Sequence, residues 1–183
     1  MADPAPPIRR LFVPNDELQR FHALWEFESN RTVSLLKALP EKQYDFRPDP
    51  EGRSLGEMAW HLAEIDAYMS HGIKTGSFSA GERPPGIERP RAVAELAPGY
   101  TRVHAEAKAR LASLTTADLE RSLQFFDGRM MTVGQILWGA LLLHSTHHRG
   151  QLVLLCRLAG GKPPGLYGPN REEMAAMRAR AKA

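Results

Sequence analysis

The stretch ILWGALLLHSTHHRGQLVLLCRLAGG, residues 136–161, decides the fold because it is the longest apolar run in the chain and contains three histidines. A capping box at Thr132 and Gln135 marks the start of a helix before this stretch, and Gly160-Gly161 mark its end. The pattern therefore predicts one helix that continues through Ala159. A helix this apolar normally lies in a protein core, where imidazoles need a metal, hydrogen bonds or water as partners.

Two histidines of this helix, His144 and His148, are four positions apart. That spacing places both side chains on one face, with Cβ atoms roughly 6 Å apart, and is typical of two ligands to one metal. His147 points about 60° away from His144, so it is an alternative ligand or, as we expect, a structural histidine. A single buried histidine is more often a hydrogen-bonded core residue than a ligand, so a metal site needs further support.

Three further helices are predicted from apolar periodicity and capping signals. They cover about 15–39, with Asn15 as candidate N-cap, about 54–74, after a capping box at Ser54 and Glu57, and about 92–114, with an irregularity at Pro98-Gly99. Four long helices with almost no strand signal predict an all-α four-helix bundle.

The connections between these helices are long, at 40–53 and 75–91, and the second is long enough to cross the body. Tyr44 and Phe46 are expected to pin the first connection to the core. A short helical turn and a hairpin at Asp127-Gly128 are predicted before the last long helix. We expect a flexible lead-in at 1–14, one bundle domain at 15–169 and a short helical tail at 170–183, capped by Asn170.

Composition is that of an ordinary globular protein, with 43% hydrophobic residues, 25% charged residues and a net charge of +3. The basic residues form no stripe with interleaved aromatics, so nucleic-acid binding is not expected. The single cysteine fits a reducing compartment, no signal-peptide core is visible, and no apolar run reaches the ~20 residues that a membrane span needs. We therefore expect a cytoplasmic protein without a membrane partner.

A third histidine, His61, lies on the flank of the apolar stripe of the helix at 54–74 and so faces inward. Facing helices of bundles commonly build metal sites, and three neutral imidazoles suit zinc, nickel, copper or iron while leaving coordination positions open. His61, His144 and His148 are therefore the candidate metal ligands. The remaining histidines are predicted to be incidental: His22, His71 and His104.

Several polar neighbours are candidates for supporting this site. Glu57 and Glu64 bracket His61 and could orient its imidazole, although a capping role for Glu57 and a solvated position for Glu64 are favoured. Gln151 either donates to a metal-bound species or is a plain core polar residue. Arg149 is expected to pair with a carboxylate on another helix, and Cys156 to be a small buried core residue.

Three motifs of the chain together resemble the DinB/YfiT-like family of bacterial metalloenzymes. They are SLGEMAWHLAEID around His61, HSTHHRGQL at residues 144–152, and CRLAGGKPPGLYG after it. The resemblance implies an up-down-down-up bundle with long crossover connections, a divalent metal held by His61, His144 and His148, and frequently a homodimer. It also implies varied activities, among them transfer of a low-molecular-weight thiol to electrophiles.

Three functional hypotheses follow from this pattern. A metal with three neutral ligands keeps its positive charge, so it would acidify a bound water or hold a thiol as thiolate. The first hypothesis is a thiol S-transferase that detoxifies small electrophiles under stress. The second is metal-dependent hydrolysis or hydration at the same site. The third is a stress-associated binding protein, not an enzyme, whose metal only ties two helices together.

Overall fold

Local capping signals set where the first two long helices begin in the computed structural model, which describes residues 16–79 and 81–181. Helix α1, Glu17–Leu36, is capped by Asp16, whose carboxylate accepts a hydrogen bond from the Leu18 N–H at 3.0 Å. The predicted cap Asn15 is one residue too early and lies outside the described residues. Helix α2, Leu55–Thr75, starts at the predicted capping box of Ser54 and Glu57 and ends at Gly76, whose φ of 78° suits glycine.

Helix α3, Val93–Leu111, follows the second long connection and is shorter at its C-terminal end than predicted. Pro98 lies inside this helix without ending it. The adjacent Gly99 is needed for packing, because a Cβ atom there would lie 2.8 Å from the ring of Trp60 on α2. At Gly99, the backbone of α3 therefore lies close to the side chain of Trp60 on α2.

The fourth long helix is continuous but not uniform. The predicted capping box at Thr132 and Gln135 starts α4, Val133–Gln135, and is followed by a π-helical segment, η3, Ile136–Leu143, and then by α5, His144–Leu158. The uninterrupted apolar run predicted a regular helix here. Wide π turns are frequent at functional sites, and this one ends where the histidines begin.

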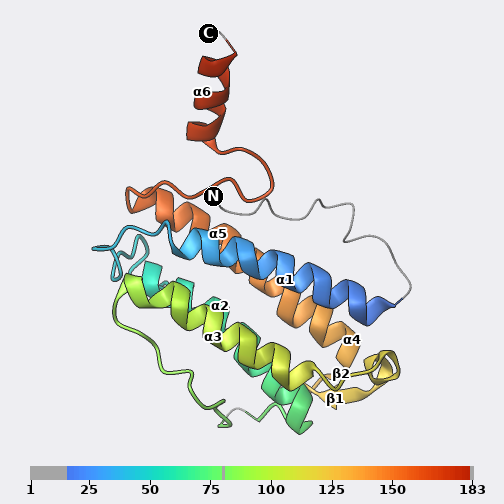
Figure 1. Cartoon of the computed structure of the whole chain (residues 1–183). Coiled ribbons are helices and arrows are strands. Elements are labelled where there is room, and N and C mark those ends of the chain that lie inside the picture. Colours follow the sequence, from blue (N-terminus) through green and yellow to red (C-terminus); the bar gives the residue numbers. More distant parts are fainter. Residues whose placement is uncertain (1–15, 80, 182–183) are drawn as a thin grey trace.

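The four helices form an up-down-down-up bundle (Figure 1). α1 and the fourth helix run in one direction, and α2 and α3 run in the other. α2 packs against both α3 and α5, so its side chains reach the centre of the bundle. The predicted all-α fold class is confirmed.

The connection between α2 and α3, residues 76–92, runs along the length of the bundle (Figure 1). It is fixed to α2 by Ile87, which is 1% exposed and whose carbonyl accepts a hydrogen bond from Trp60 Nε1 at 3.1 Å. The first connection joins neighbouring helix ends. Tyr44 is buried there and Phe46 packs on the core, as predicted.

The segment between α3 and the fourth helix contains a 3₁₀ turn, η2, Thr116–Glu120, and a hairpin of strands β1, Ser122–Gln124, and β2, Met130–Thr132. The hairpin turns at Gly128, with a φ of 83°, as the Asp127-Gly128 pair predicted. The hairpin covers one end of the bundle and, as shown below, forms one wall of a cleft.

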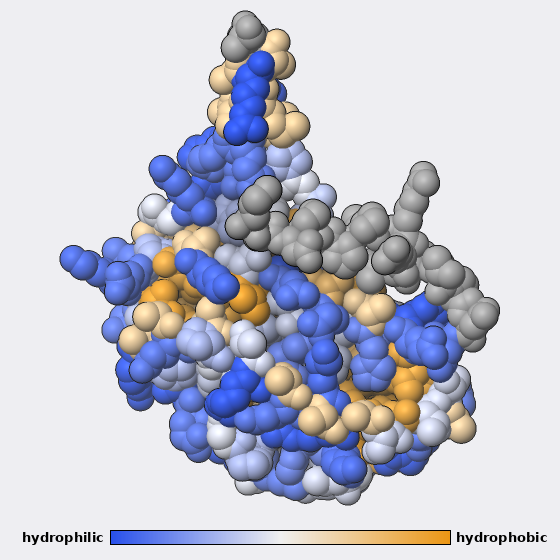
Figure 2. Space-filling view, in the orientation of Figure 1, coloured by the Kyte–Doolittle hydropathy of each residue, from blue (hydrophilic) through white to orange (hydrophobic). Residues whose placement is uncertain are grey.

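Helix α6, Arg171–Arg180, stands away from the bundle and buries none of its residues (Figures 1 and 2). Its first turn is joined to α5 by Arg157, which donates to both carboxylate oxygens of Glu172 at 2.7 and 2.6 Å. The face in Figure 2 is mainly hydrophilic, with hydrophobic areas toward the two ends of the bundle. Within residues 16–79 and 81–181, no helix has the length and apolarity that a membrane span requires.

Candidate metal centre

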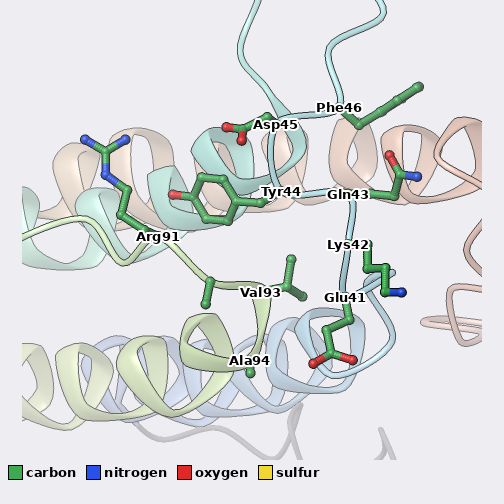
Figure 3. A pocket seen from close by; sticks show the side chains of 10 residues that line it. Glu41, Lys42, Gln43, Tyr44, Asp45, Phe46, Arg91, Val93 and Ala94 are labelled. Atoms are coloured by element: carbon green, nitrogen blue, oxygen red, sulfur yellow. The ribbon is translucent and has the colours of Figure 1, made fainter.

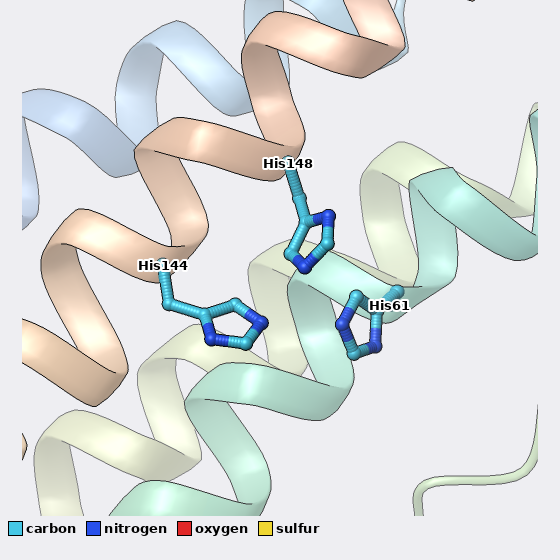
Figure 4. Close-up of side chains that lie close together, drawn as sticks. All are labelled: His61, His144 and His148. Carbon is cyan, nitrogen blue, oxygen red and sulfur yellow. The ribbon is translucent and has the colours of Figure 1, made fainter.

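Three histidines from two helices converge in the bundle (Figure 4). His61 comes from α2, and His144 and His148 come from successive turns of α5. One ring nitrogen of each lies within 4.8 Å of those of the other two. The ring centroids are 4.5 Å apart for His144 and His148, and 4.6 and 5.7 Å from His61 to His148 and His144.

Two of the rings are oriented by hydrogen bonds at Nδ1. His148 Nδ1 lies 2.6 Å from the amide oxygen of Gln151, and His61 Nδ1 lies 3.2 Å from a carboxylate oxygen of Glu64. Both oxygens are acceptors, so Nδ1 carries the proton in each ring and Nε2 keeps its lone pair. Metal-bound histidines in proteins commonly show this arrangement, because the outer hydrogen bond fixes the tautomer.

Glu64 is itself held by the crossover connection. Arg89 donates to its second carboxylate oxygen at 3.1 Å. Burial raises the pKa of Glu64, but the hydrogen bonds from His61 and Arg89 outweigh burial and leave that pKa below its usual value. The carboxylate therefore stays ionised, and the favoured expectation of a solvated Glu64 is wrong.

Glu57 has a different role from Glu64, although both carboxylates contact Arg89. Glu57 accepts a hydrogen bond from the Ser54 backbone N–H at 2.8 Å and pairs with Arg47 at 2.8 Å. This is the capping role that the sequence favoured. Glu57 thus secures the start of the helix that carries His61.

Burial favours the neutral form of two of the clustered histidines, His144 and His148. Burial, and then the neighbouring histidines, lower the pKa of His144. Burial is also the largest cause for His148, whose pKa is lowered to about 4 although the Gln151 hydrogen bond raises it. Neutral imidazoles with free lone pairs are the form that binds a divalent metal, so the donor set fits such an ion.

The predicted ligands His61, His144 and His148 are thus brought together, and His147 is not part of the group. The His147 side chain is exposed, and its ring lies next to that of His148, at 5.0 Å between centroids. Cys156 is fully buried, and burial raises the pKa of its thiol, as expected for a core residue.

Arg149 binds the carboxylate of another helix, as predicted. Its side chain is 2% exposed and contacts the carboxylate of Glu28, the Glu28 carbonyl oxygen at 2.6 Å and the Tyr167 hydroxyl. Tyr167 also donates to Glu28 at 2.5 Å. Arg149 therefore connects α5, α1 and the loop after α5, on the side away from the histidines.

Two of the three histidines predicted to be incidental have partners. His104 is buried, and its Nδ1 lies 2.7 Å from Asp66, which also accepts from Trp25 at 3.1 Å. His71 lies 2.8 Å from Glu82 on the crossover connection. The signal that could have revealed the first pair is an aspartate at a core position of an apolar helix, since such a carboxylate needs a partner.

A cleft of about 730 Å³ adjoins the cluster, with His61 and His144 in its wall. Most of its lining is apolar and comes from α2 and from the hairpin with its turn: Ile65, Tyr68, Met69, Phe125, Phe126 and Met131. Gly139 and Ala140 of η3 form the floor, and Arg53 and Arg129 are the cations of the wall. The sequence did not assign these residues to a site, because three separate segments supply them.

A second hollow, of about 680 Å³, lies where the first connection meets the start of α3 (Figure 3). Its lining carries charges of both signs, from the acidic Glu41 and Asp45 and the basic Lys42 and Arg91. The Tyr44 ring extends across it toward the segment of Arg91 (Figure 3). None of the three clustered histidines lines it, so the cleft beside them is the better candidate for chemistry.

A family model of the DinB superfamily matches residues 24–152 of the chain. The chain belongs to the DinB superfamily. A relative, YrdA of Bacillus subtilis, is 33% identical over 162 residues, which cover 86% of this chain and 92% of YrdA. The predicted family membership is therefore confirmed.

Solved structures of DinB-like proteins share the fold. A DinB-like protein of Bacillus cereus has a TM-score of 0.67 and 26% identity, covering 82% of this chain and 97% of its own. The DinB-like protein YjoA of Bacillus subtilis has a TM-score of 0.63 and 25% identity, covering 83% and 99%. This DinB-superfamily chain therefore spans nearly the full length of both.

Proposed function

We propose that this DinB-superfamily chain is a divalent-metal-dependent enzyme that transfers a low-molecular-weight thiol to small electrophiles. The observation that supports the proposal is the contact between the three-histidine cluster and an apolar cleft large enough for a small organic molecule. Zinc, nickel or iron would suit three imidazole ligands. A divalent ion with three neutral ligands keeps its full charge, so it favours the thiolate form of a bound thiol.

The residues around the site have separable roles in this proposal. His61, His144 and His148 would hold the metal, while Gln151 and Glu64 keep the Nδ1 protons of two of these rings in place. In the transfer, the thiol gives its proton to solvent, its sulfur forms a bond to the electrophilic carbon, and the leaving group departs with its bonding electrons. The apolar cleft would seat the body of the electrophile and exclude part of the water.

The test begins with elemental analysis of protein purified without added metal, next to His61→Ala and His148→Ala. We expect about one divalent ion per chain in the wild type and strong depletion in both variants. The metal-loaded protein is then assayed for conjugation with a panel of thiols and electrophiles. Acceleration by the wild type, together with its loss in His148→Ala, supports the proposal.

Other outcomes separate the alternatives. If no thiol is conjugated but esters or activated double bonds react with water in a metal-dependent way, the site is a hydrolase or hydratase. A purely structural metal would link α2 and α5, so His148→Ala would lower thermal stability while no turnover is found with any substrate. Homodimer formation, a role under stress and a cytoplasmic location stay predictions.

A further inference from the structure

The cleft beside the histidines changes character along its length. Arg53 lies just before the cap of α2, and the α2 residues of the cleft wall then follow in the order His61, Tyr68 and Met69. At 1.5 Å per residue, His61 is about 12 Å from Met69 along the helix axis. The fourth helix runs the opposite way, so Gly139 lies toward the Met69 end and His144 toward the Arg53 end. The histidines therefore lie between a cationic end and an apolar end.

The apolar end is formed largely by aromatic side chains from the hairpin. The rings of Phe125 and Phe126 are 4.9 Å apart, and Phe78 packs against both at 5.1 and 5.3 Å. Phe126 is nevertheless 45% exposed, which is unusual for a large apolar side chain in an aromatic cluster. A Cβ atom at Gly139 would meet no atom within 4 Å, so this end of the cleft is open. It is suited to an apolar group of a ligand.

The cationic end is formed by Arg53. Its side chain is exposed, and no hydrogen bond or ion pair within residues 16–79 and 81–181 involves it. The other cation of the cleft, Arg129, is bound to Asp127 at 2.8 and 2.6 Å. The carboxylate Glu64 is already occupied by Arg89 and His61. Among the charged residues that line the cleft, Arg53 is therefore the one whose side chain is available to bind a ligand.

We propose that the cleft binds a small organic anion with an apolar body, whose carboxylate pairs with Arg53 and whose apolar part lies against Phe125 and Phe126. The planar guanidinium matches a carboxylate with two parallel hydrogen bonds, and one cation balances one negative charge, which favours a carboxylate over a phosphate dianion. The middle of such a molecule would lie at the histidines. This inference rests on the proposed function, because it names the class of electrophile for the same site.

The test uses 4-phenylbutyrate as a probe, measured by isothermal titration calorimetry with the protein as purified and after removal of metal by a chelator. Its neutral analogue 4-phenylbutanamide lacks the charge, and acetate lacks the apolar body. We expect both to bind at least about 10-fold more weakly than 4-phenylbutyrate, because the amide loses the hydrogen bond to a charged group and acetate loses the burial of the apolar body. Arg53→Gln should lower the affinity for 4-phenylbutyrate by about 10-fold and leave the affinity for the amide unchanged.

Two variants test the apolar end. Gly139→Leu fills the open floor and should weaken both aromatic probes by about 10-fold, because the side chain takes the space of the ring. Gly150→Leu is the matched control: it lies on the same helix, its Cβ would also meet nothing within 4 Å, and it does not line the cleft. Phe126→Ala is a second test that does not depend on Gly139→Leu folding. Because Phe126 is exposed, this variant should fold, and it should lower the affinity for both aromatic probes.

The proposal is overturned if the amide binds as tightly as 4-phenylbutyrate, if Gly150→Leu weakens binding as much as Gly139→Leu, or if Phe126→Ala has no effect. It is also overturned if Arg53→Gln leaves affinity unchanged while removal of metal abolishes binding, since the carboxylate would then bind the metal. The readout needs no turnover. A failed thiol-conjugation assay with intact probe binding therefore contradicts the proposed function and leaves the proposed ligand class standing.

Discussion

Glu64 and Glu57 lie seven residues apart on α2 and both contact Arg89, yet only Glu64 contacts a histidine of the cluster. We therefore expect Glu64→Ala to weaken metal binding and Glu57→Ala to leave it unchanged. Loss of a carboxylate that orients a ligand histidine typically weakens metal affinity 10–100-fold. The contact is 3.2 Å long and its two side chains are 17% and 20% exposed, so the lower end applies, about 10-fold or 1.4 kcal/mol.

The assay is a competition titration with a chelator of known zinc affinity at pH 7.5, combined with denaturant unfolding of the metal-free proteins. Glu57→Ala removes a capping interaction, so we expect it to lower the free energy of unfolding by about 1 kcal/mol. The reasoning is refuted if Glu64→Ala binds zinc within twofold of the wild type. It is equally refuted if Glu57→Ala loses as much affinity as Glu64→Ala.

Three further predictions concern stability and charge. Arg149→Met leaves the largely buried Glu28 carboxylate without its cation, although Tyr167 still donates to it, so chemical denaturation should show a loss of about 3 kcal/mol. Thr132→Ala removes the cap of the fourth helix, and its free energy of unfolding should fall by about 1 kcal/mol. The Arg157 hydrogen bonds lower the pKa of Glu172 to about 2 from 4.5, so this pair should persist above pH 4.5 and be lost as pH falls toward 2. An NMR titration of the Glu172 carboxyl in wild type and Arg157→Gln checks that window.

The parts of the fold that were predictable from sequence are those with local causes. The capping boxes at Ser54 and Thr132 use residues three positions apart, and the hairpin needs only Asp127-Gly128 between short strands. The histidine cluster was predictable for a related reason. Two of its members share one helix face, and the third needed only an inward position on a second helix of a bundle.

Features that depend on distant packing were not predictable in this way. The π-helical segment Ile136–Leu143 has an apolar sequence that is equally compatible with an α-helix, so its geometry depends on the neighbouring helices. Asp66 at a core position of α2 indicates that a partner is needed, but its partner His104 lies 38 residues away and is brought to it only when α2 and α3 pack. The cleft is the clearest case, because Arg53, Phe126 and Gly139 come from three segments that meet only after the bundle forms.

The motif HSTHHRGQ contains residues with two different roles: some form the histidine cluster, and Arg149 joins the fourth helix to α1. His148 faces α2 and the cleft side, whereas Arg149, the next residue, lies about 100° further around the helix and binds Glu28 of α1. Gln151, three positions after His148, returns to the histidine face and orients that ring. A substitution at Arg149 should therefore act on the fold, and one at Gln151 on the metal centre, although the two residues lie in the same turn of α5. Measuring zinc affinity and unfolding free energy for both variants separates these effects, since each variant should change mainly one of the two quantities.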